Sequence, residues 1–108
     1  MRKIKDYQEL EVIFNINKDK LVIVDFFATW CGPCRMLSEM LNSLSDEELK
    51  DVIVVKVDVD ESEDLMTKYS IRSIPTMIYF KNGEMIDRTT GGMNKETFLE
   101  KVNKMCAK

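Results

Sequence analysis

The stretch Trp30-Cys31-Gly32-Pro33-Cys34-Arg35 contains two of the three cysteines of this chain and joins two segments with different apolar patterns. It follows an apolar run over residues 21–28 and precedes a segment of helical period over 35–49. A buried strand is therefore expected to end, and a helix to begin, at the two cysteines. Pro33 suits the first turn of a helix, because that turn leaves backbone N–H groups unpaired and proline has none. Gly32 allows another part of the backbone to come close.

The predicted helix start places the two thiols near a partial positive charge. A helix N-terminus offers free N–H groups and a partial positive charge, which favour a thiolate over a thiol at Cys31. Residues that lie three apart share a helix face and differ by roughly 4.5 Å along its axis. A disulfide can bridge that separation, so Cys31 and Cys34 are predicted to form a reversible dithiol–disulfide couple.

Other uses of the cysteines fit less well. A bridge that closes so short a loop stabilises a fold by only about 2 kcal/mol. Half of a zinc site would need two more ligands, and the chain has no histidine and no second pair of this spacing, so no metal site is predicted. Cys106 is a lone thiol on the last predicted helix, and we interpret it as a small packing residue without a redox role.

Length and composition set further limits. The chain has 108 residues, 44% hydrophobic and 32% charged, which is typical of a single globular domain over 1–108. A net charge of −3 gives no argument for binding nucleic acid or an anionic membrane. No apolar run approaches the roughly 18 residues of a membrane span, and the polar start carries no signal-peptide core. These features predict a cytoplasmic protein, in a compartment where disulfides are usually transient and catalytic.

Periodicity, caps and turn signals predict an α/β chain of alternating elements. The strands are expected over 2–5, 21–28, 52–58, 76–81 and 84–90, and the helices over 7–16, 35–49, 62–69 and after a cap at Asn94. The first three strands should be parallel with right-handed crossovers. Asn82-Gly83 is a strong hairpin signal, so the last two strands should be antiparallel and the sheet mixed.

Two charged residues interrupt apolar strands and are therefore candidate site residues. Asp25 lies within 21–27, where a carboxylate is costly unless it is paired, neutralised or on a solvent-exposed face of the strand. Lys56 lies within 52–58 and would be near Asp25 if the two strands pair. It could equally be a surface lysine whose stem covers apolar atoms.

A proline marks a second candidate region. Ile74-Pro75 comes directly before a predicted strand, where proline is confined to an edge, a strand start or a tight turn. X–Pro bonds in folded proteins are cis in about 5% of cases, so the spacing alone leaves the isomer open.

These features together resemble the thioredoxin family over essentially the whole chain, through Val24-Asp25-Phe26, the Trp30 to Cys34 stretch, Ile74-Pro75-Thr76 and Gly91-Gly92. The resemblance implies a thioredoxin-like fold with a mixed five-stranded sheet flanked by four helices. It implies a thiol–disulfide oxidoreductase that reduces disulfides in target proteins. Cys31 would be the attacking thiolate and Cys34 the resolving thiol. Asp25 would be the buried acid–base group for Cys34, with Lys56 as its neighbour.

The resemblance also implies how partners bind. Pro75 would be cis and packed against the disulfide, and Ile74 would offer its backbone to a substrate. The implied substrate-binding residues are Trp30, Gly32, Pro33, Ile74, Pro75, Gly91 and Gly92. The implied partners of a monomeric chain are disulfide-containing substrate proteins and a thioredoxin reductase, a flavoprotein. This chain itself is expected to carry no cofactor, because it lacks the Gly-x-Gly-x-x-Gly nucleotide fingerprint.

The chain also departs from the family pattern. Glu39 stands where most relatives have a helix-kinking proline, Phe27 replaces a frequent tryptophan, and Ser73 replaces a common glycine. These changes leave the redox roles intact and bear on partner preference. Gly32-Pro33 resembles reductases more than the histidine-containing oxidases and isomerases. A non-catalytic binding module and a disulfide oxidase or isomerase on the same fold remain the alternatives.

Overall fold

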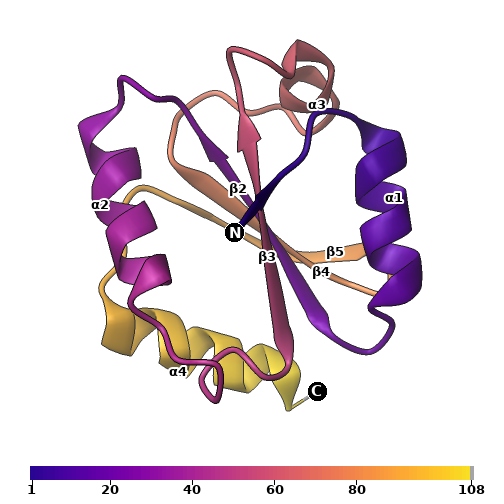
Figure 1. Ribbon diagram of the computed structural model, residues 1–108, viewed down its shortest axis with the longest axis vertical. Coiled ribbons are helices and arrows are strands. Elements are labelled where there is room, and N and C mark those ends of the chain that lie inside the picture. Colours follow the sequence, from indigo (N-terminus) through magenta and orange to yellow (C-terminus); the bar gives the residue numbers. More distant parts are fainter. Residues whose placement is uncertain (108) are drawn as a thin grey trace.

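The computed structural model describes residues 1–107 of the chain. Strands and helices alternate until a closing hairpin and a last helix, in the order that the sequence predicts (Figure 1). The elements are β1 (Arg2–Lys3), α1 (Tyr7–Ile16), β2 (Leu21–Phe27), α2 (Gly32–Asn42), β3 (Val52–Asp58), α3 (Glu63–Lys68), β4 (Thr76–Lys81), β5 (Glu84–Thr90) and α4 (Lys95–Cys106). Within these residues, no helix is long and apolar enough to cross a membrane.

Within residues 1–107, the strands form one mixed sheet of five, in the order β1-β3-β2-β4-β5. β1 and β2 both run parallel to β3, whereas β4 is antiparallel to β2 and to β5. The predicted mixed five-stranded sheet with four helices is confirmed. β2 therefore has a hydrogen-bonded neighbour on each side, and its register places Asp25 beside Lys56 of β3.

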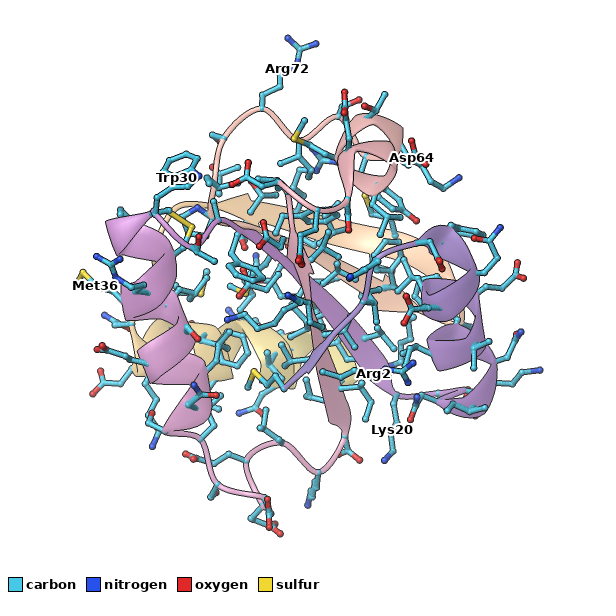
Figure 2. The ribbon with its side chains drawn as sticks, turned by 45° about the horizontal axis from the view of Figure 1, so that its top comes forward. Arg2, Lys20, Trp30, Met36, Asp64 and Arg72 are labelled. Carbon is cyan, nitrogen blue, oxygen red and sulfur yellow. A yellow bond between two sulfur atoms is a disulfide. The ribbon has the colours of Figure 1, made fainter. Side chains whose placement is uncertain are left out.

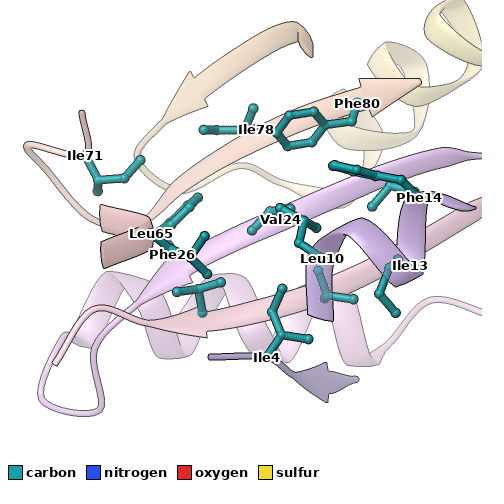
Figure 3. Close-up of a cluster of buried hydrophobic side chains, with 13 residues drawn as sticks. Ile4, Leu10, Ile13, Phe14, Val24, Phe26, Leu65, Ile71, Ile78 and Phe80 are labelled. Carbon is teal, nitrogen blue, oxygen red and sulfur yellow. The ribbon is translucent and has the colours of Figure 1, made fainter. Parts of the chain in front are cut away.

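Alternate residues of the strands enter two apolar clusters, one on each face of the sheet. The first cluster joins α1 and α3 to the sheet and includes Leu10, Phe14, Phe26 and Leu65 (Figure 3). The second joins α2 and α4 to the opposite face through residues such as Leu37, Leu41, Phe98 and Val102. Because β2 contributes to both clusters, its near-continuous apolar sequence is explained by burial on both faces.

Local signals set most element boundaries. Asp6 accepts a hydrogen bond from the N–H of Glu9, and Asn94 accepts one from Thr97, so both residues cap the helices that follow them. Asn82 and Gly83 have φ angles of 52° and 79°, as a two-residue hairpin turn requires.

The helix after the cysteines differs from the prediction over 35–49. It begins earlier, at Gly32, because Cys31 acts as the N-cap and its sulfur accepts the N–H of Cys34. It ends earlier, at Asn42, and Leu44 enters the core from the connection that follows the helix. Ser45 and Glu48 exchange hydrogen bonds there in a separate turn. Smaller differences are the shorter first strand and the trimmed ends of β2 and α3.

Candidate active site

Cys31 and Cys34 lie where β2 ends and α2 begins, and they form a disulfide (Figure 2). Their Cα atoms are 5.2 Å apart. The backbone N–H of Cys34 points at the sulfur of Cys31, 3.2 Å away. Both cysteines are buried, and Cys31, at 6% exposure, is the more accessible residue of the two, since Cys34 is only 2% exposed.

The Ile74-Pro75 peptide bond is cis, as the family resemblance implies. Ile74 packs against the small cluster that contains both cysteines. Pro75 is buried, and its carbonyl oxygen accepts the N–H of Gly91 at 2.8 Å. This hydrogen bond joins the loop before β4 to the loop after β5, although the two loops are far apart in the sequence.

Trp30 is 68% exposed, and its indole N–H donates a hydrogen bond to the Oδ2 atom of Asp60 at 2.8 Å. Figure 2 shows its ring at the outer end of the loop before α2, close to the disulfide. It lines a groove with side chains that follow β3 and precede β4, among them Val59, Ile71 and Ile74.

A second groove lies along the start of α2. It is lined by Pro33, Met36, Leu37, Gly92, Met93 and Asn94. The predicted substrate-binding residues therefore divide between two hollows: Trp30 and Ile74 line the first, Pro33 and Gly92 the second. Gly32 is half-buried and Gly91 is exposed.

Asp25 is fully buried, at 0% exposure, and neither of its carboxyl oxygens has a hydrogen-bond partner among the described residues. The alternative of a solvent-exposed carboxylate is therefore wrong. Burial raises the pKa of Asp25 from its ordinary value of 3.8 to about 6, and the nearby positive charge of Lys56 opposes that rise. A carboxyl group of this kind can take up and release a proton near neutral pH.

For Lys56 the sequence left two interpretations open, a neighbour of Asp25 and a surface lysine whose stem covers apolar atoms, and the structure shows features of both. It is the register partner of Asp25, and it is half-buried. Its ammonium nevertheless makes no ion pair with Asp25 within residues 1–107. Instead it donates a hydrogen bond to the Oγ atom of Ser38 at 2.8 Å and lies 4.5 Å from the ring centroid of Phe27.

Sequence reasoning missed two residues at this site. Ser38 follows Cys34 by four positions, so helical periodicity places both on one face of α2 and could have drawn attention to its hydroxyl group. Asp60 follows Trp30 by thirty positions, and no local signal in the sequence connects the two.

The third cysteine lies apart from this site. Cys106 is a free, half-buried thiol on α4 and packs against the second apolar cluster. Burial raises the pKa of its thiol, and the charge of Asp51 adds to that rise. Within residues 1–107, no group of three or more histidine, cysteine, aspartate or glutamate side chains could hold a metal ion.

The family model described as Thioredoxin matches residues 5–104. This chain belongs to the thioredoxin family. It is 44% identical over 103 residues to the M-type chloroplastic thioredoxin of Pisum sativum, covering 89% of this chain and 60% of that protein. It is 40% identical over 100 residues to a thioredoxin of Mycoplasmoides gallisepticum, covering 93% of this chain and 97% of that protein.

Solved structures agree with the sequence relatives. The structure of Fasciola hepatica thioredoxin matches with a TM-score of 0.87 and 38% identity, covering 96% of this chain and 98% of that chain. Family membership, the thioredoxin fold and a cysteine pair that forms a disulfide are consistent with thiol–disulfide oxidoreductase function. The predicted family and fold are confirmed.

Proposed function

We propose that this protein reduces disulfides in target proteins, with Cys31 as the attacking thiolate and Cys34 as the resolving thiol. The observation that carries this assignment is the place of Cys31 at the N-cap of α2, where its sulfur accepts the N–H of Cys34 at 3.2 Å. A donor aimed at sulfur, together with the positive end of the helix, favours the thiolate. The greater exposure of Cys31 supports the same order of reaction.

In the first step, the Cys31 thiolate attacks one sulfur of the target disulfide. A bond forms between Cys31 and that sulfur, and the target's own S–S bond breaks. The second target sulfur leaves as a thiolate and takes a proton from solvent.

In the second step, Cys34 gives its proton to Asp25 and attacks the sulfur of Cys31. The Cys31–Cys34 disulfide forms, and the bond from Cys31 to the target breaks. The target sulfur leaves Cys31 as a thiolate and takes a proton from solvent, so the target has gained two electrons and two protons and is released as a dithiol. The burial of Asp25, its pKa of about 6 and the lack of a hydrogen-bond partner for its oxygens within residues 1–107 support its role as the proton acceptor.

Target proteins are proposed to dock over the disulfide, between the groove at Trp30 and Ile74 and the groove at Pro33 and Gly92. Pro75 supports this placement because it has no N–H to compete for the cysteine sulfurs. A thioredoxin reductase is proposed to return the disulfide to the dithiol, so that the protein carries electrons in general redox homeostasis. We propose a cytoplasmic monomer, although the name of the pea relative shows that chloroplastic members exist.

The Cys34→Ser variant tests the order of the two thiols. Without the resolving thiol, Cys31 should stay joined by a mixed disulfide to a target protein that carries an exposed disulfide. An added dithiol should break this adduct and release the target. Cys106→Ser is the matched control and should turn over like the parent. Turnover by Cys34→Ser at the parent rate would contradict the assignment.

Two measurements separate the alternatives. A binding module would keep its partner when both Cys31 and Cys34 are replaced by serine, whereas a reductase would lose all activity. An oxidase or isomerase would show a reduction potential well above the roughly −270 mV that is typical of thioredoxin.

A further inference from the structure

Lys56 and Asp25 carry side chains of opposite charge type at adjacent backbone positions, yet within residues 1–107 no hydrogen bond or ion pair joins them. Their register places both side chains on the face of the sheet that α2 covers. A buried carboxylate and a nearby ammonium ordinarily pair, because both lose water on burial. Here both oxygens of Asp25 are without a partner in the described part of the chain.

The ammonium of Lys56 is directed to α2 instead. The Oγ atom of Ser38 accepts its hydrogen bond at 2.8 Å, and the Phe27 ring lies 4.5 Å from it. Among residues 1–107, Ser38 is the one hydrogen-bond acceptor that the structure gives this ammonium. Ser38 lies one helical turn after Cys34, so the charge is held on the helix that carries the resolving thiol.

Other charged groups around the pair have their own partners or point outward. Lys3, the β1 neighbour of Lys56, pairs with Glu61 at 2.7 Å. Asp58 of β3 accepts the N–H of Asp60. The hydroxyl of Tyr79, on β4, is bonded to Thr89 at 2.8 Å. From α2, Arg35 donates to the carbonyl of Thr29, and Glu39 is exposed.

We propose that Ser38 is a positioning residue: its hydroxyl holds the Lys56 ammonium out of contact with Asp25, so that the carboxylate stays free to accept the Cys34 proton. This inference rests on the proposed role of Asp25 in the resolving step. Direct pairing would commit the carboxylate to Lys56 and make it a weaker base. Loss of the cation would raise the pKa of Asp25 further, so that a larger share of the carboxyl groups would already be protonated and unable to accept a proton.

The Ser38→Ala variant tests the proposal through the titration of Asp25, followed by the 13C shift of its carboxyl carbon in the oxidised protein. Without the hydroxyl, the Lys56 ammonium loses that acceptor. It is then free to turn to the oxygens of Asp25, its register partner, which have no hydrogen-bond partner within residues 1–107. The titration midpoint should fall by about one pH unit, because an opposite charge at close range favours the carboxylate. An unchanged or higher midpoint would overturn the proposal.

Two further variants show whether Ser38 acts through Lys56. Ser38→Thr keeps a hydroxyl and should restore the parent midpoint. In a Lys56→Gln background, Ser38→Ala should have no further effect, because the charge that it repositions is gone. Ser43 lies just after the end of α2, and its hydroxyl donates a hydrogen bond to the carbonyl of Met40. Ser43→Ala is the control and should leave the titration midpoint of Asp25 unchanged. A full shift in the Lys56→Gln background would contradict the proposal.

The pH profile of the resolving step separates this inference from the proposed function. In single-turnover reduction of a disulfide substrate, Ser38→Ala should reach half of its plateau rate at lower pH and have a lower plateau than the parent. If the Asp25 titration moves while the rate profile stays at the parent's, the positioning role of Ser38 stands. In that case the proposed role of Asp25 as proton acceptor fails.

Discussion

The backbone N–H of Gly91 donates a hydrogen bond to the carbonyl oxygen of Pro75 at 2.8 Å. This bond joins the loop after β5 to the loop before β4. Gly91 adopts a φ angle of 83°, a left-handed conformation that disfavours residues with a Cβ atom. The neighbouring Gly92 has no such angle, and both glycines have open space where a Cβ would lie.

The two adjacent glycines form a matched pair for mutation. Gly91→Ala should lower the free energy of unfolding by about 1–2 kcal/mol, because alanine is strained at this φ angle. Gly92→Ala should change that free energy by less than about 0.5 kcal/mol, since it is exposed and unstrained. Urea denaturation of the two variants measures both values. Equal free energies of unfolding for the two variants would mean that the backbone conformation at position 91 tolerates a Cβ atom without strain.

In the reduced protein, Cys31 should be the first thiol that iodoacetamide labels near pH 7. The advantage over Cys34 and Cys106 should be about tenfold or more, because a cysteine at a helix N-terminus has the larger thiolate fraction. Cys106 is a useful internal comparison, since it is more exposed than Cys31 but burial raises the pKa of its thiol. Peptide mapping after a short reaction gives the order. Faster labelling of Cys106 would show that exposure, not thiolate character, governs reactivity.

Replacing Asp25 by alanine should stabilise the oxidised protein at neutral pH. Because the pKa of Asp25 rises from 3.8 to about 6 on folding, the folded state binds more protons than the unfolded state between these values. Stability therefore falls as pH rises through this window, and the loss is complete above it. The shift corresponds to about 3 kcal/mol, an upper value for the gain because the smaller side chain leaves a cavity.

Denaturant melts at pH 4 and pH 7 measure this gain. The advantage of Asp25→Ala should be present at pH 7 and shrink at pH 4, where Asp25 is protonated in most folded molecules. Asp46→Ala, a change at an exposed turn position, is the control. Its free energy of unfolding should differ from the parent's by the same small amount at both pH values. If Asp25→Ala is less stable than the parent at pH 7, the burial of an uncompensated carboxylate is refuted.

Trp30→Ala should weaken target reduction while leaving the fold intact. An exposed tryptophan at a docking surface commonly contributes about 2 kcal/mol or more to binding, which corresponds to at least a tenfold fall in kcat/KM for a protein substrate. The free energy of unfolding should change little, because the side chain is 68% exposed.

The exposed Val12 on α1 gives a control that is far from the grooves, and Val12→Ala should not affect kcat/KM. Labelling of Cys31 by iodoacetamide should be equal in Trp30→Ala and the parent, because that reaction needs no docking. A slower labelling rate would indicate that Trp30 acts on the cysteine itself.

Most of the fold could be predicted from the sequence because its signals are local. The caps Asp6 and Asn94 and the turn at Asn82-Gly83 each determine a boundary within a few residues. The end of α2 was predicted wrongly because apolar periodicity continues past it. Leu44 is buried from an irregular connection as effectively as it would be from a helix, so the apolar pattern alone does not distinguish the two.

The site was predictable only in part, because some of its contacts join residues that are far apart in the sequence. The spacing of Cys31 and Cys34 indicates their disulfide, because both lie on one short segment. The direction of the Lys56 ammonium depends on how α2 packs over the sheet, and the apolar pattern of β3 carries no information on that packing. The bond between Trp30 and Asp60 likewise arises only when two loops meet in the folded chain.

The central place of β2 affects which parts of the molecule can open without unfolding it. This strand is hydrogen-bonded to β3 and β4 and buried on both faces, so its amide hydrogens should exchange with solvent only when the whole sheet opens. Cys31 follows the end of this strand after a short connection. The reactive pair is therefore attached to the part of the chain with the slowest local opening. We therefore expect fluctuations of the outer elements, such as the two-residue β1, to leave the geometry of the dithiol unchanged.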